Sequence, residues 1–142
     1  MTIAAILKGK GSEVVQARPD EAVLDVVRLL ADRRIGCVPV VDQGSVVGIF
    51  SERDLLYHFA QDGLEILHRA VGNVMTAPAI SIDRQTPVLV ALSLMTRRRI
   101  RHLPVVEDGS LLGIVSIGDL VKYRIDGIES EAAALRNYIQ SA

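Results

Sequence analysis

Tryptophan is absent from this sequence, cysteine occurs once, and aromatic residues make up only 4% of the 142 residues. The single cysteine, Cys37, cannot form an internal disulfide, which excludes a small secreted scaffold held together by disulfides and makes a cytoplasmic location the expectation. An excess of positive charge is also lacking, since 16 basic residues are balanced by 17 acidic ones. The net charge of −1 provides no global field for nucleic acid or an anionic membrane, so neither is expected as a partner.

Long hydrophobic runs are missing too, although 49% of the residues are hydrophobic and the mean hydropathy is +0.31. The run at residues 3–7 ends at Lys8 and is shorter than the core of a signal peptide. No stretch approaches the roughly 18 apolar residues that a membrane-spanning helix needs. Because the apolar residues are dispersed in short segments, we expect a globular protein that buries about two-thirds of its unfolded surface in a packed core.

An internal repeat organises the chain. Residues 35–55 align without a gap on residues 100–120, and eleven of these 21 positions are identical. The identities include Pro39 with Pro104 and Gly48 with Gly113, and the match extends backwards into the preceding segment. Agreement at this density indicates a duplicated unit.

Each copy predicts the same order of elements, β-α-β-β-α. The periodicity of the apolar residues and the turn residues between them place the elements of the first copy at residues 14–17, 23–30, 37–41, 46–50 and 51–61. The second copy gives the ranges 79–82, 88–95, 102–106, 111–115 and 116–124. Pro39 and Pro104 lack the N–H that a central strand donates, so we expect them at a sheet edge or a bulge.

The predicted fold class is therefore α+β. Two β-α-β-β-α units pack sheet to sheet with pseudo-two-fold symmetry, because one unit alone is too small for a sufficient core. We expect a first repeat with a short N-terminal helix at 1–70, a second repeat at 71–125 and an amphipathic C-terminal helix at 126–142, which Gly127 separates from the preceding helix. The apolar face of that last helix, at Ile128, Ala132, Leu135 and Ile139, either folds back or meets a partner chain.

The two hairpins with the helix starts that follow them resemble a tandem pair of CBS domains, known as a Bateman module. The signature Gly-apolar-apolar-Ser/Thr-x-x-Asp/Asn stands twice, at residues 48–54 and 113–119. The resemblance covers roughly residues 14–123. It implies a regulatory module that binds adenine nucleotides such as AMP, ATP or NAD(H), or S-adenosylmethionine derivatives.

The resemblance also implies which residues bind the nucleotide. The serines of the signature would donate to phosphate at a helix start, and the aspartates would accept from the ribose hydroxyls. The start of the second strand of each unit would frame the base. Apart from the resemblance, the charge and position of nearby arginines suit contacts with phosphate. The expected site residues are Gly36, Cys37, Val38, Ser51, Arg53 and Asp54 in the first copy, and Arg99, Arg101, His102, Leu103, Ser116 and Asp119 in the second.

Simpler interpretations of these residues stay open. Ser-x-x-Asp is also a capping box, which any helix can use without a ligand. Arg53 can equally be a solvent-exposed salt-bridge residue, and the basic run at 97–101 can be a solvated face. His58, His68 and His102 have no ligand partners at metal spacing, so no metal is expected.

Three functions remain as hypotheses. The favoured one is a non-catalytic sensor of adenine nucleotides that modulates a separate partner protein. The alternatives are a protein–protein interaction module with vestigial nucleotide sites, and an enzyme, for which no set of catalytic residues is recognised. A homodimer is expected, with the helices after Ser51 and Ser116 as its surface. The apolar residues expected there are Leu55, Leu56, Phe59, Leu120 and Val121.

Overall fold

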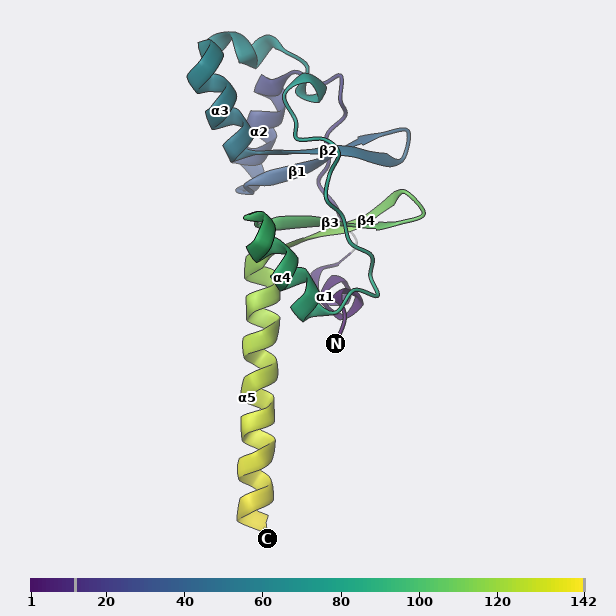
Figure 1. Cartoon of the computed structure of the whole chain (residues 1–142), viewed down its shortest axis with the longest axis vertical. Helices are drawn as coiled ribbons and strands as arrows, with labels where there is room; N and C mark the ends of the chain where they lie inside the picture. Colours follow the sequence, from purple (N-terminus) through teal and green to yellow (C-terminus); the bar gives the residue numbers. More distant parts are fainter. Residues whose placement is uncertain (12, 142) are drawn as a thin grey trace.

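The structure, a computed structural model, describes residues 1–11 and 13–141. The first repeat contains α2 (Val23–Arg33), β1 (Cys37–Asp42), β2 (Ser45–Ser51) and α3 (Glu52–Asp62), followed by two short 3-10 helices, η1 (Gly63–His68) and η2 (Val71–Asn73). The second repeat contains α4 (Val88–Arg98), β3 (His102–Glu107), β4 (Ser110–Ser116) and α5 (Ile117–Ser141), and α1 (Ile3–Lys10) precedes both. Figure 1 shows the two hairpins one above the other, with α5 extending from the second repeat.

The two hairpins have the same register. In β1 and β2, Cys37 pairs with Ser51 and Asp42 with Ser45; β3 and β4 repeat this pairing from His102 to Glu107. Each tight turn contains a Gly with positive φ, as two-residue hairpin loops require. The hairpins and the helices that flank them confirm the predicted α+β repeat.

The two repeats meet through their sheets, as expected. The strand order is β1-β2-β4-β3, and β2 pairs with β4 at one position, Ser45 with Ser110. Pro39 and Pro104 therefore lie on the outer strands, next to a register shift in each hairpin. Their missing N–H groups are tolerated at an edge, which confirms the expected placement.

The predicted strands at 14–17 and 79–82 are wrong in length. Each is reduced to one parallel bridge, from Ala17 to Val40 and from Ile82 to Val105. Ala17 donates its N–H to the carbonyl of Pro39 at 3.0 Å and accepts from Val41 at 2.8 Å. Extending the ladder backwards would require an N–H from Pro39, which proline lacks, and the same holds at Pro104 in the second repeat.

Each repeat has its own core, and each core also receives residues from a segment outside the predicted range of its repeat. The first core contains residues of α2, β1 and β2 together with Val71 and Val74. The second contains residues of α4, β3, β4 and α5 together with Ile3 and Ile6 of α1. The helix α1 packs against β4 and α5 of the second repeat. The N-terminal helix therefore completes the second repeat, whereas the predicted grouping joined it to the first.

The helix α5 runs without interruption through Gly127, so the predicted break is wrong. A glycine inside a helix costs only about 1 kcal/mol relative to alanine, which 25 consecutive helical residues can accommodate. The helix does not fold back, since residues 128–141 lie away from both repeats (Figure 1). Leu120, which was expected on the dimer surface, is fully buried in the second core and therefore cannot contribute to that surface.

Candidate functional site

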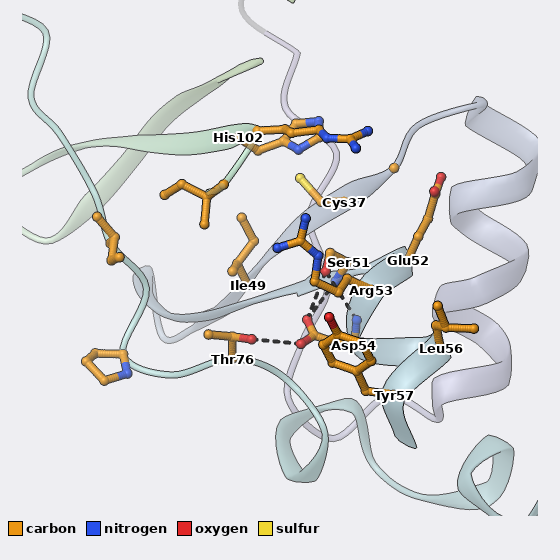
Figure 2. A pocket seen from close by; sticks show the side chains of 15 residues that line it. Cys37, Ile49, Ser51, Glu52, Arg53, Asp54, Leu56, Tyr57, Thr76 and His102 are labelled. Carbon is orange, nitrogen blue, oxygen red and sulfur yellow. Dashed lines mark hydrogen bonds between the residues drawn. The ribbon is translucent and has the colours of Figure 1, made fainter. Parts of the chain in front are cut away.

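A cavity of about 540 Å³ lies between the repeats, within the usual range for small-ligand sites. Figure 2 shows its wall, to which α3 contributes Asp54 and Tyr57 and β3 contributes His102 from the other repeat. The lining residues are Gly36, Cys37, Ile49, Ser51, Glu52, Arg53, Asp54, Leu56, Tyr57, Thr76, Pro78, Ile80, Ile100, Arg101 and His102. Seven of the twelve predicted site residues are among them.

A capping box fixes Asp54 in this first cavity. The N–H of Ser51 donates to Asp54 Oδ2 at 2.9 Å, and the N–H of Asp54 donates to Ser51 Oγ at 3.4 Å. The Thr76 hydroxyl donates to the other carboxylate oxygen, Oδ1, at 2.7 Å (Figure 2). Ser-x-x-Asp therefore does form a capping box here. The Asp54 carboxylate still faces the cavity and can accept further hydrogen bonds.

Gly48 explains how Thr76 reaches Asp54. A Cβ at Gly48 would lie 2.5 Å from Met75 Sδ and 2.8 Å from the carbonyl oxygen of Thr76. Without it, Ile49 and Thr76 exchange two backbone hydrogen bonds of 2.9 Å. The close approach that Gly48 permits is therefore made by the backbone of the segment around Thr76.

The start of α3 offers fewer donors than the sequence suggested. The N–H of Glu52 donates to the carbonyl of Gly36 at 3.0 Å, and the N–H of Asp54 is taken by the cap. The Arg53 guanidinium reaches across to the second repeat and donates to the carbonyl of Arg99 at 3.0 Å. Arg53 thus connects the two repeats, and Arg99 contributes its carbonyl to that contact.

Cys37 and His102 lie side by side on the wall of the cavity (Figure 2). Burial, reinforced by Asp54 and Glu52, raises the pKa of the Cys37 thiol to about 12, so it stays protonated and unreactive at neutral pH. Burial, with Lys10 and Arg101, lowers the pKa of His102 below its usual value despite the nearby carboxylates. The ring is therefore neutral at pH 7 and presents an aromatic face to the cavity.

The second signature faces a smaller cavity of about 380 Å³, which includes Ser116 and Gly113. Asp119 closes the same capping box, at 2.8 Å to the N–H of Ser116. Its partner beyond the cap is Lys10, whose ammonium group lies 2.7 Å from Asp119 Oδ2 and also donates to the carbonyl of Ile114 at 2.9 Å. Burial opposes ionisation of Asp119, but the hydrogen bonds from Lys10 and Ser116 prevail and lower its pKa.

The two cavities are built in the same way. Each lies between the signature of one repeat and the segment that precedes the other repeat in the sequence. The first includes Thr76 and Ile80, and the second includes Val14 and Val15. Sequence reasoning missed these residues and Lys10. The equivalence of residues 11–17 and 76–82 in the repeat was the signal that could have found them, although nothing in it marks Lys10 as a partner of Asp119.

Four predicted site residues line neither cavity: Val38, Arg99, Leu103 and Asp119. The side chains of Val38 and Leu103 are fully buried in the two cores. Strand alternation explains this, because Cys37 and His102 face the cavities and the next residue of each strand faces the opposite way.

Residues 1–11 and 13–141 contain no cluster of three or more His, Cys, Asp or Glu side chains placed to hold a metal ion. None of the helices in this part of the chain is long and apolar enough to cross a membrane.

Comparison with known proteins supplies the family. The CBS domain family model matches residues 11–61 and 71–126. The mitochondrial CBS domain-containing protein CBSX3 of Arabidopsis thaliana is 34% identical over 98% of this chain and 72% of its own length. The CBS-domain protein ATU1752 from Agrobacterium tumefaciens superposes with a TM-score of 0.83 at 38% identity, covering 87% of this chain and 99% of its own.

A second similar structure contains a ligand. CBSX2 in complex with AMP has a TM-score of 0.75 at 26% identity, over 88% of this chain and 96% of its own. The duplicated signature, the paired hairpins and the two family matches agree with one another. This chain therefore belongs to the CBS domain family, as a tandem pair of CBS domains.

Proposed function

We propose that this protein is a non-catalytic sensor that binds an adenine nucleotide, AMP, ATP or NAD(H), in the first cavity and modulates a separate partner protein. The observation that carries the proposal is the Asp54 carboxylate, fixed by its cap and open to a cavity of about 540 Å³ between the repeats. The AMP bound to the similar protein CBSX2 supports the ligand class.

The lining of the first cavity suits the parts of a nucleotide. Apolar side chains, among them Ile80 and Ile100, offer a surface for the base. Asp54 accepts hydrogen bonds from the ribose hydroxyls, a role that carboxylates take in dinucleotide folds. Arg101 is exposed at the edge of the cavity, where its guanidinium can pair with phosphate.

A ligand between the repeats can act as a signal because it contacts both of them. Binding favours whichever arrangement of the repeats makes the better contacts, and a partner that distinguishes these arrangements responds to the nucleotide. We place this regulation in the cytoplasm, as the lone unreactive cysteine suggests, although the relative CBSX3 is named as mitochondrial.

The second cavity favours the alternative function for its half of the molecule. Lys10 forms an ion pair with Asp119 at Oδ2, the oxygen that also accepts the cap N–H of Ser116, so a ligand at this carboxylate would have to compete with an ammonium group. An interaction module with vestigial nucleotide sites would show such a contact at both cavities. At Asp54 the corresponding contact comes from the neutral hydroxyl of Thr76, which a ligand hydroxyl can replace without separating charges.

Calorimetric titration of AMP, ATP and NADH tests the proposal. Asp54→Ala removes charge-assisted hydrogen bonds worth roughly 1.5 to 3 kcal/mol each, and a loss of about 2.7 kcal/mol weakens binding about a hundredfold. Asp119→Ala is the matched control, since it removes the same cap in the other repeat, and we expect little change of affinity there. Both variants should lose about 1 kcal/mol of stability through the cap. No binding to the wild type at millimolar nucleotide, or equal affinity in Asp54→Ala, contradicts the sensor function, as does turnover of any nucleotide.

A further inference from the structure

The helix α5 carries an apolar stripe that no described part of the chain covers. Its apolar residues recur at alternating spacings of three and four, the a and d positions of a heptad repeat. The d positions hold Val121, Ile128 and Leu135, and the a positions hold Ile125, Ala132 and Ile139. The exposed fraction is 42% at Val121, 49% at Ile128 and 64% at Ile139. The face that packs on the second repeat is a different one, marked by the fully buried Leu120.

The C-terminal half of α5 is unsupported within the described chain. Every residue from 128 to 141 except Ala132 is exposed, and Figure 1 shows this part of the helix projecting away from both repeats. Isolated helices shorter than about 12 to 15 residues are marginal in water, because most helical stability comes from packing an apolar face. A further packing surface is therefore needed.

The charges beside the stripe identify the partner. In a parallel coiled coil, the g position of one helix lies beside the e position of the next heptad in the other. In α5 these positions pair Arg124 with Glu129 and Glu131 with Arg136. Both pairs join opposite charges when a second α5 lies parallel and in register.

The opposite orientation is disfavoured by the same residues. An antiparallel pair that also buries all the a and d residues brings e beside e and g beside g. Glu129 would then face Glu129 of the second copy, Glu131 would face Glu131, and Lys122 would face Arg136. Like charges across a coiled coil select against that arrangement.

We propose that α5 forms a parallel, in-register, two-stranded coiled coil with α5 of a second copy of this chain. This goes beyond nucleotide binding and does not depend on it. It moves the expected homodimer contact from α3 and the start of α5 to the length of α5. With the two helices parallel, both copies carry their repeats at the same end of the assembly.

Disulfide trapping tests the register and the orientation. In the parallel arrangement the two Ile139 side chains share one a layer, whereas Asn137, at an f position, faces outwards. Mild oxidation of Ile139→Cys should give a covalent dimer, and oxidation of Asn137→Cys should give at least about tenfold less. Cys37 does not compete, because it is buried with a pKa of about 12. Leu135→Asp in the Ile139→Cys chain should abolish trapping, while Asn137→Asp should leave it unchanged.

Reversing the charges beside the stripe provides a second test of the coiled coil. Glu131 and Arg136 are both exposed, and neither forms an ion pair in the chain over the residues that the structure describes. Glu131→Arg should reduce trapping at Ile139→Cys, and adding Arg136→Glu should restore it. A wild-type monomer or trimer by light scattering at tens of micromolar, equal trapping at both positions, or no rescue by the double reversal would overturn the proposal.

Discussion

At the scale of single residues, Asp54 and Asp119 occupy equivalent places but are held by different groups. A neutral hydroxyl, from Thr76, contacts Asp54 at 2.7 Å, whereas an ammonium group, from Lys10, contacts Asp119 at the same distance. A ribose hydroxyl can replace the first contact by one of the same kind. Replacing the second separates an ion pair that is partly shielded from water. This difference supports the proposal that the nucleotide binds in the first cavity and not in the second.

Removing the lysine should therefore free the second cavity. In Lys10→Ala the carboxylate of Asp119 loses its counter-charge and regains acceptor capacity. We expect a second nucleotide to bind, raising the calorimetric stoichiometry from one to two per chain, with unchanged affinity at the first site. Lys8→Ala is the control, since Lys8 lies exposed on the same helix. A stoichiometry of one in Lys10→Ala would show that the size or shape of the second cavity excludes the nucleotide.

At the scale of elements, the two signature glycines control how neighbouring segments approach the sheet. A Cβ at Gly48 would meet the backbone of Thr76 at 2.8 Å, but at Gly113 it would meet the end of the Leu7 side chain at 2.7 Å. A side-chain end can rotate away, while a segment held by backbone hydrogen bonds cannot. The same substitution is thus expected to act differently in the two repeats.

Gly48→Ala should lower the free energy of unfolding by about 1 to 3 kcal/mol, the usual cost of overpacking. It should also weaken nucleotide binding, since it displaces the backbone around Thr76, which forms part of the wall of the first cavity. Gly113→Ala, the matched variant, should cost less than about 1 kcal/mol and leave binding unchanged. Urea unfolding and calorimetry measure both effects. Equal losses of stability in the two variants would contradict this account of the contacts.

The helices and strands that depend on interactions between residues close in the sequence could be predicted from local sequence patterns. Hairpin turns and helical periodicity located β1 to β4, α2 and α4, and the duplication verified each range in its second copy. The strand at 14–17 failed because a proline on the neighbouring strand removes the donor it needs. The break at Gly127 failed because helix propensity is weak compared with the continuity of a long helix.

At the scale of the whole molecule, the cavities exist only because the repeats meet. The signature serines and aspartates could be predicted, since they lie within one repeated motif. Thr76 and Lys10 could not, because long-range packing at Gly48 and Gly113 brings them to the two aspartates. The same packing places α1 in the core of the second repeat, far from its position in the sequence.

The coiled coil and the nucleotide site should be separable in the intact fold. Truncation after Asp126 removes Ile128, Leu135 and Ile139 from the stripe, but it removes nothing from either core or from the first cavity. Because a dimer is stabilised by mass action, the melting temperature of the wild type should rise with protein concentration, and that of the truncated chain should not. The truncated chain should have a monomer mass by light scattering and bind nucleotide with unchanged affinity. A truncated chain that stays dimeric would place the contact between copies on the repeats, and one that loses nucleotide binding would show that the first cavity depends on the pairing of α5.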